Sequence, residues 1–291
     1  MAEHTRTAAR RTTTRRTTKF LKPAARELVR ARVLACEQIS PSFVRVTVGG
    51  ERLSTIAPMG FDQWFRMLFP DTGRRTLHLP EAAGDDQWWP QLQAMPDDIR
   101  PLLRNYTIRR YRTAGSGRFG DTAEIDIDFA VHGDLGPASV WADAARPGDE
   151  VGVLDEGIVY QPVQDARWQL LVGDDSALPA LAGILDSMEF DGRVDVFVEV
   201  AHPDDVAAQD LRAGFGVRIH PVVRPDPDAR PGVSVTEAVR SAALPDGPGY
   251  AFVAGESGLV TGVRRHLVRD RGLPKSAVTF TGYWNHGAAA Y

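Results

Sequence analysis

The stretch RWQLLVGDDSALPALAGILDSM (residues 167–188) decides the fold of the second half of this chain. It begins with an apolar run that indicates a buried strand. A Gly-Asp-Asp-Ser turn follows, and the second apolar segment indicates a helix. The segment RVDVFVEV (residues 193–200) follows as another buried strand. A strand, a helix and a strand in this order predict a βαβ unit, and therefore a mainly parallel sheet.

The same alternation continues toward the C-terminus. Further strands and helices are expected at residues 216–223, 234–244, 250–255 and 257–272. In the last of these helices Leu259, Val263 and Leu267 fall on one apolar stripe, and Gly272 suits the C-terminal cap. We therefore predict a doubly wound, mainly parallel α/β nucleotide-binding domain over residues 166–291.

Upstream of this domain the patterns are those of β-strands. FVRVTV (residues 43–48) and EIDIDFAV (residues 124–131) alternate apolar and polar residues, and QWFRMLFP (residues 63–70) is a more apolar strand. Turn-rich pieces separate these runs, which indicates a closed antiparallel β-barrel over residues 21–160. Residues 81–98 interrupt it as an exposed insertion. The predicted fold class is thus β + α/β.

Composition narrows the class of protein. The 291 residues have an ordinary apolar fraction of 43% for a globular chain of two domains. The single cysteine, Cys36, excludes a disulfide framework or a cysteine-bound zinc or iron–sulfur site within one chain, and no metal site is expected. Without an apolar run of membrane-spanning length or a secretory signal, we expect a soluble cytoplasmic protein. We also expect it to be a monomer.

The N-terminal segment differs from the rest in charge. Residues 1–20 carry a formal charge of about +5, whereas the remainder carries about −9. Because this Thr- and Arg-rich segment has few apolar residues to bury, we expect a disordered basic tail. A nucleic-acid arm, a membrane-surface arm and a transit peptide are the alternatives, and no nucleic-acid partner or membrane insertion is expected.

The stretch RNYTIRRYR (residues 104–112) combines four arginines with two tyrosines in what reads as one strand. Residues two apart on a strand share a face, so Arg104 and Tyr106 should point the same way, with Thr107 beside them. A guanidinium can bind a pyrophosphate bidentately, and a phenol ring can stack on a flavin or adenine. This stretch therefore favours a flavin dinucleotide, although a solvated strand face has the same pattern.

Three further segments suit phosphates or nucleotides. In HGDLGPASVWA (residues 132–142) a Gly-Pro pair leads into a short helix, whose free backbone N–H groups can bind a phosphate. VGDDSALPA (residues 172–180) and VAGESG (residues 253–258) follow strands of the parallel sheet, at the edge where nucleotides bind. None of them is the G-x-G-x-x-G fingerprint, so each signal is weak alone.

Six motifs in one order, RNYTIRR, DFAVHGDLGPASVWA, PGDEV, GDDSALPA, AGESG and GYWNHG, resemble the siderophore-interacting proteins. The resemblance runs from about residue 28 to residue 287. It implies an N-terminal β-barrel that binds FAD and an α/β domain that binds NAD(P)H, as in the ferredoxin-reductase-like superfamily. It also implies reduction of ferric siderophores by a flavoprotein.

The resemblance assigns site residues by motif. The FAD motif is matched by Arg104, Tyr106, Thr107 and Arg109, with Tyr106 and Thr107 as catalytic residues beside the flavin. Further FAD-proximal positions are His132, Gly133, Gly136, Pro137, Ala138 and Ser139. The nicotinamide nucleotide segments are matched by Asp174, Asp175, Ser176, Gly255 and Glu256, and the C-terminal aromatic motif by Tyr283 and Trp284.

The implied reaction is hydride transfer from NAD(P)H to FAD, followed by single-electron reduction of an Fe(III) chelate that releases Fe(II). Because many ferric siderophores are anionic, Arg66, Arg110 and Arg112 are candidate substrate-binding residues. Asp204 and Asp205 follow the second parallel strand, where their carboxylates would repel a 2′-phosphate, so the sequence weakly favours NADH. Arg218 or Arg224 could instead bind a 2′-phosphate, which would favour NADPH. Two alternatives stay open: a general NAD(P)H–flavin reductase of a protein electron carrier, and a non-catalytic flavin- or siderophore-binding protein.

Overall fold

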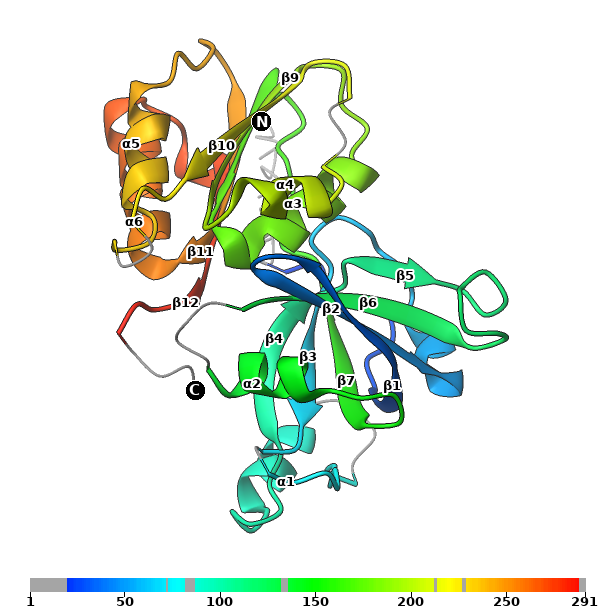
Figure 1. The fold of residues 1–291 in the computed structure, drawn as a ribbon. Helices are drawn as coiled ribbons and strands as arrows, with labels where there is room; N and C mark the ends of the chain where they lie inside the picture. The colour runs from blue at the N-terminus through cyan, green and yellow to red at the C-terminus, as the bar shows by residue number, and fades with distance from the viewer. Residues whose placement is uncertain are drawn as a thin grey trace, which may run out of the picture.

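The computed structural model describes residues 20–71, 73–81, 87–131, 136–211, 214–226 and 229–287, which form two sheets (Figure 1). The strands of the first sheet are β1 (Leu28–Ser40), β2 (Phe43–Gly50), β3 (Trp64–Phe69), β4 (Leu102–Thr107), β5 (Arg110–Arg112), β6 (Ala123–Ala130) and β7 (Glu150–Gly157). Those of the second are β8 (Trp168–Gly173), β9 (Arg193–Val200), β10 (Val217–Val223), β11 (Gly249–Glu256) and β12 (Val278–Trp284). The α-helices are α1 (Trp88–Ala94), α2 (Pro137–Ala144), α3 (Leu178–Ser187), α4 (Pro203–Ala208), α5 (Val233–Ser241) and α6 (Ser257–Arg265).

The first sheet is antiparallel, with strand order β4-β3-β7-β1-β2-β6-β5. Its alternating sequences place apolar side chains on one face: Val44, Val46 and Val48 of β2 face Ile125 and other apolar side chains of β6 in one core. The polar side chains that alternate with them in β6 are buried as well. The predicted antiparallel barrel is therefore confirmed, as a curled sheet in which the outer strand β4 approaches β6 near the other end of the strand order. Among the described strands no ladder pairs β4 with β6, and the ring of Tyr106 packs on Phe129 across that seam.

The second sheet is parallel throughout, with strand order β10-β9-β8-β11-β12. Helix α3 packs on one face, and α5 and α6 pack on the other (Figure 1). The strand order reverses between β8 and β11, so the carboxyl ends of these strands form the switch point at which nucleotides bind in such folds. The predicted doubly wound α/β domain is confirmed.

The sequence placed most elements within a residue or two. The stripe Leu259, Val263 and Leu267 is buried as expected, and Gly272 has the positive φ of a C-terminal cap, 73°. The last helix is shorter than predicted, because α6 ends at Arg265 and a π-helical turn follows at His266–Asp270.

The insertion at residues 81–98 is expected to be exposed, and most of its described residues are, with two exceptions that anchor it to the barrel. Trp88 and Leu92 of α1 are buried against Leu68 and Leu154 of the barrel, because these two residues lie four apart on one face of the helix. The predicted basic tail, residues 1–20, lies outside the described residues except for Phe20. None of the described helices is long and apolar enough to span a membrane.

Candidate functional site

The stretch 104–112 is not one strand, as the sequence predicted, but two strands at opposite ends of the sheet order. β4 ends at Thr107 and β5 begins at Arg110. Between them, the N–H of Ile108 donates to Gln63 O at 2.8 Å and the N–H of Arg109 to Asp126 O at 2.9 Å. These acceptors belong to different sides of the barrel, so the chain crosses the seam at this point. Periodicity could not show the crossing, since both halves alternate like a strand.

Arg104 and Tyr106 share a face of β4, since they pair with Met67 and Phe65 of β3 two residues apart. The ring of Tyr106 lies 4.3 Å from that of Phe129, and burial raises the pKa of its phenol. The Arg104 guanidinium donates to Leu103 O at 2.7 Å, and no carboxylate among the described residues forms an ion pair with it. A partly buried arginine without an anionic partner, beside an aromatic ring, fits a pyrophosphate and a flavin ring.

Thr107 and Tyr283 join the two domains at this point. Thr107, at the end of β4, is buried, and its hydroxyl lies close to the phenol of Tyr283 in β12. Burial raises the pKa of Tyr283, and the nearby carboxylates of Asp62 and Asp174 raise it further. The phenol is therefore neutral at physiological pH, and its side chain is still 38% exposed. The structure thus brings two motif residues together that lie 176 positions apart in the sequence.

Helix α2 begins at Pro137 after Gly136, as expected, and no described side chain caps its first turn. No atom of the described residues lies within 4 Å of the position that a Cβ of Gly136 would take. The hydroxyl of Ser139 donates to Ala130 O at 3.3 Å, so it anchors the helix to β6. Ala138 is nearly buried under this turn. The remaining two predicted residues of the motif, His132 and Gly133, lie outside the described residues.

At the switch point the predicted nucleotide residues bind one another. The buried carboxylate of Asp174 accepts hydrogen bonds from Ser176 N, Ser176 Oγ, Glu256 N and Trp284 Nε1 at 2.5–3.0 Å. Burial raises its pKa, although these donors stabilise the anion. Gly255 has φ 129°, and a Cβ there would lie 2.7 Å from the Asp174 carboxylate. Asp174 is therefore the junction of β8, β11 and β12.

Asp175 and Glu256 are likewise engaged by the protein. Asp175 accepts from Ala201 N at 3.1 Å and from Arg224 Nη2 at 2.9 Å. Glu256, 3% exposed, accepts from Gly258 N and Leu259 N and so caps α6. The carboxylate of Glu256 therefore occupies the helix N-terminus that would otherwise suit a phosphate.

The two arginines considered as ligands of a 2′-phosphate lie at opposite ends of β10. Arg224 is at the carboxyl end of β10, and its side chain is 8% exposed because Asp175 and Glu199 enclose it. Arg218 is near the amino end of the same strand, at the edge of the sheet away from the switch point. Of the two acidic residues, Asp204 is exposed and Asp205 is fully buried against Ser40 of the barrel.

Arg66 lies in a cationic cluster with Lys22 and Arg26 around one carboxylate. All three cations pair with Glu156, whose side chain is fully buried, and the Arg66 Nε distance is 2.5 Å. The Arg66 guanidinium also lies over the ring of Trp88, 5.4 Å from its centroid. On β3, Arg66 pairs with Asn105, next to the FAD motif. Three cations around one carboxylate leave a net positive charge at this face of the barrel.

The other arginines of the stretch are separated from Arg66. Arg112 donates to Glu124 and, through two nitrogens, to Asp126 at 2.6 and 2.7 Å. The hydrogen bond to Asp126 raises the pKa of Arg112. Arg110 pairs with Asp210 of the second domain at 3.4 Å. Both belong to β5 and are paired with carboxylates outside the cluster at Glu156, so we leave them out of the proposed substrate site.

Sequence reasoning missed Asp62, a carboxylate at the same domain junction. It is 1% exposed and accepts hydrogen bonds from Val159 N and Tyr160 N in the connection between the two sheets. Burial raises its pKa to about 6, although those N–H groups oppose the rise. No local pattern marks this residue, because its partners lie nearly one hundred positions away. No group of three or more metal-ligating side chains occurs in the described part of the chain.

Two family models match this chain. The siderophore-interacting FAD-binding domain matches residues 32–159, and the siderophore-interacting protein model matches residues 166–287. Ferric vibriobactin reductase ViuB of Vibrio cholerae is 30% identical over 251 residues, which cover 86% of each chain. The crystal structure of a siderophore utilization protein from T. fusca has a TM-score of 0.77 at 29% identity, covering 94% of this chain and 97% of that one.

A more distant structure shows the fold alone. A ferredoxin NADP+ reductase from Neisseria gonorrhoeae, with bound FAD and NADP, is 16% identical and has a TM-score of 0.55 over 88% of this chain and 99% of that one. The architecture of barrel and parallel sheet is therefore ferredoxin-reductase-like.

Proposed function

This chain belongs to the siderophore-interacting protein family, and we propose that it is an NAD(P)H-dependent flavoprotein that reduces ferric siderophores. One observation carries the proposal: Arg104, a cation without an ion-pair partner among the described residues, lies beside Tyr106 and Thr107, where Tyr283 reaches across from the other domain. The likeness to a ferric vibriobactin reductase supports the substrate class.

The barrel residues suit FAD in chemistry and placement. Arg104 would bind the pyrophosphate, and the open first turn of α2 would add backbone N–H donors to it. The ring of Tyr106 would lie against an aromatic face of the cofactor, and the Thr107 hydroxyl would hydrogen-bond its edge. FAD, when bound, accepts electrons in pairs from a nicotinamide and passes them on singly. A siderophore binds Fe(II) far more weakly than Fe(III), so the transfer of one electron to the bound iron is enough to release it.

The nicotinamide nucleotide would bind at the switch point, over Asp174 and Ser176. These residues shape the edge of the sheet, and backbone groups of the β8–α3 and β11–α6 turns would contact the nucleotide. We propose a preference for NADH, because Arg224 is paired with Asp175 and Arg218 is at the other end of β10. Arg230, whose side chain is 62% exposed near Glu256, is the residue to replace in a test for a phosphate contact.

The cationic cluster of Lys22, Arg26 and Arg66 would attract an anionic iron chelate toward the flavin edge. Its net positive charge raises the local concentration of anions, and this effect falls as salt rises. Trp64 pairs with Thr107 across β3 and β4 and carries Lys22 over its ring, so the cluster is next to the FAD motif. The chain's contribution at this face is attraction and orientation, without a direct iron ligand.

Anaerobic stopped-flow spectroscopy on the purified protein tests the proposal. We expect a yellow protein whose flavin absorbance bleaches with NADH and returns when a ferric catecholate or hydroxamate chelate is added. Replacing Arg66 by Met should slow the second phase and weaken its salt dependence, whereas Arg118→Met, at an exposed pair with Glu37, should not.

Three outcomes would contradict the proposal. A colourless protein that does not bind added FAD would reject it outright. A flavoprotein that NADH and NADPH fail to reduce would favour the non-catalytic binding protein. Faster electron transfer to ferredoxin or flavodoxin than to any ferric chelate would favour the general flavin reductase.

A further inference from the structure

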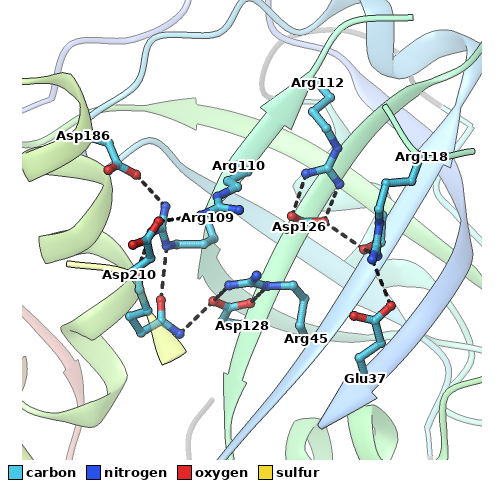
Figure 2. A network of polar contacts seen from close by, with 12 residues as sticks. Glu37, Arg45, Arg109, Arg110, Arg112, Arg118, Asp126, Asp128, Asp186 and Asp210 are labelled. Carbon is cyan, nitrogen blue, oxygen red and sulfur yellow. Dashed lines mark hydrogen bonds and ion pairs between the residues drawn. The ribbon is translucent and has the colours of Figure 1, made fainter. Parts of the chain in front are cut away.

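A buried network of polar side chains crosses the boundary between the two domains (Figure 2). On the barrel side, Arg45 of β2 donates to both carboxylate oxygens of Asp128 in β6, each at 2.7 Å. Asp128 Oδ2 also accepts from Gln209 Nε2 at 2.7 Å. Gln209 directly follows α4 of the second domain and is fully buried.

Arg109 completes the network from the turn between β4 and β5. Its Nε donates to Gln209 Oε1 at 3.2 Å, and its Nη2 donates to Gln209 O at 2.6 Å. Its Nη1 donates to Asp186 of α3 at 2.8 Å (Figure 2). The Arg109 side chain is fully buried, so three of its nitrogens are committed to two helices of the nucleotide domain. Below, the interdomain network means Arg45, Asp128, Gln209, Arg109 and Asp186.

A second contact lies beside the interdomain network and has the same character. The Asp205 carboxylate accepts from Ser40 Oγ at 2.7 Å and from Ser42 N at 3.2 Å, at the turn between β1 and β2. Asp205 belongs to α4, which is the helix that ends at Gln209. Helix α4 is therefore bound to the barrel near both of its ends.

Such buried, directional bonds fix the relative position of the two domains more than they stabilise the fold. Removing charges from water costs about as much as their attraction returns, so an apolar interface would hold the domains at least as strongly. An apolar interface, however, tolerates small sliding movements, whereas hydrogen bonds with fixed donors and acceptors select one arrangement. The interdomain network thus specifies how α3 and α4 sit on the barrel.

We propose that Arg109 and Gln209 are positioning residues, which set the distance between the nicotinamide site and the flavin site without touching either cofactor. This inference rests on the proposed function, in which the barrel holds FAD and the α/β domain holds the nucleotide. Hydride transfer needs the reacting atoms about 3–3.5 Å apart, and a shift of about 1 Å can cost on the order of 100-fold in rate. The family motif assigns Arg109 to the cofactor, and its buried partners indicate a different role.

The test compares Arg109→Met with Gln209→Met. Both remove the bond from Arg109 Nε to Gln209 Oε1; the first also removes the bonds to Asp186 and Gln209 O, and the second also removes the bond to Asp128. In both variants we expect the limiting rate of flavin reduction by NADH to fall by about 10- to 100-fold, with the FAD dissociation constant within about twofold of wild type. Because both changes disrupt the same interdomain network and share one lost bond, the double variant should be slowed by less than the product of the two single effects. Arg118→Met, an exposed arginine of the barrel in Figure 2, is the matched control and should keep the wild-type rate.

A second readout needs no cofactor. Hydrogen exchange in the FAD-free variants should lose protection at α4 and at residues 40–42, while the strands of both sheets keep theirs. If Arg109→Met fails to fold, Arg109→Lys keeps the charge without the planar fork, and it should show the same slow reduction and the same local loss of protection.

Three results would overturn the inference. Weaker FAD binding in Arg109→Met with no effect of Gln209→Met would make Arg109 a cofactor ligand. Wild-type reduction rates and wild-type exchange in both variants would leave the interdomain network without a positioning role. Loss of protection across both sheets would show general destabilisation. If NADH and NADPH fail to reduce the wild-type flavin, the proposed function fails, and the exchange experiment still decides whether the network holds the domains.

Discussion

The barrel half of the candidate site leaves its polar groups open, whereas the nucleotide half binds its own. Among the described residues of the barrel, Arg104 has a backbone carbonyl as its hydrogen-bond partner and no ion pair, and no side chain caps the first turn of α2. In the nucleotide domain, Asp174 accepts four hydrogen bonds from its own domain, and Glu256 caps α6. The motif residues of the barrel are thus available to a ligand, whereas those of the nucleotide domain hold the fold together.

The difference follows from where the backbone itself can bind a ligand. The carboxyl edge of a parallel sheet offers turns and helix N-termini, so side chains such as Asp174 are needed to hold that edge in shape. A strand of a barrel has no helix N-terminus to offer an anionic ligand, so a side chain such as Arg104 supplies the positive charge. Loss of a side chain should therefore lower stability at the edge of the parallel sheet and weaken cofactor binding at the barrel.

The largest effect is expected at Asp174. Asp174→Ala leaves the N–H groups of Ser176, Glu256 and Trp284 without their buried acceptor, which should lower the free energy of unfolding by about 3–5 kcal/mol. Guanidinium unfolding curves measure the loss. Asp174→Asn keeps one acceptor oxygen and should lose less. A loss of nucleotide affinity at wild-type stability would break the comparison.

A smaller effect is expected at Asp62, at the junction of the two halves. Burial raises the folded pKa of Asp62 to about 6 from an ordinary value of 3.8. Because the folded state holds this proton more tightly, the stability it contributes is present below pH 3.8 and is lost as pH rises through 6. Asp62→Asn removes this dependence, so the variant should gain about 3 kcal/mol relative to wild type between pH 4 and pH 7.

Unfolding curves of the wild type and Asp62→Asn at several pH values check this prediction. Only the difference between the two proteins counts, since other carboxylates titrate in the same range. A difference that stays constant with pH would mean that Asp62 titrates near its ordinary value.

At Arg104 the expected loss is in affinity. Arg104→Met removes a charge-assisted contact to the pyrophosphate, so FAD should bind about 10- to 100-fold more weakly. The free energy of unfolding of the FAD-free protein should change by less than about 0.5 kcal/mol, because the guanidinium has no ion-pair partner among the described residues. Flavin fluorescence titration gives the affinity. A marked loss of stability with unchanged affinity would assign Arg104 to the scaffold.

The smallest effect is expected at Arg118, an exposed cation of the barrel. Its side chain is 50% exposed and pairs with Glu37 at 3.1 Å. Exposed pairs of this kind contribute about 0–1 kcal/mol, so Arg118→Met should change stability slightly and FAD affinity not at all. Thermal melts and the same fluorescence titration measure both. A change in FAD affinity here would mean that total barrel charge, and not the position of Arg104, controls binding.

Local patterns predicted the elements well where one face is buried throughout. The alternation in β2 and β6 follows from the apolar face that packs into the barrel core, and the apolar runs in β8 and β9 follow from burial of both faces of the parallel sheet. The prediction failed at residues 104–112, where the chain crosses the seam. The acceptors for Ile108 N and Arg109 N are supplied by Gln63 and Asp126, and no local pattern encodes such partners.

For the site, the sequence alone determined which residue types the cofactor motifs contain and in which order they follow along the chain. Only the tertiary structure decided which of them remain open to a ligand, because an arginine is free or neutralised according to the carboxylates that the fold brings to it. Arg104 and Arg109 look alike in the sequence, yet one meets a single backbone carbonyl and the other is enclosed by Gln209 and Asp186 from a separate domain.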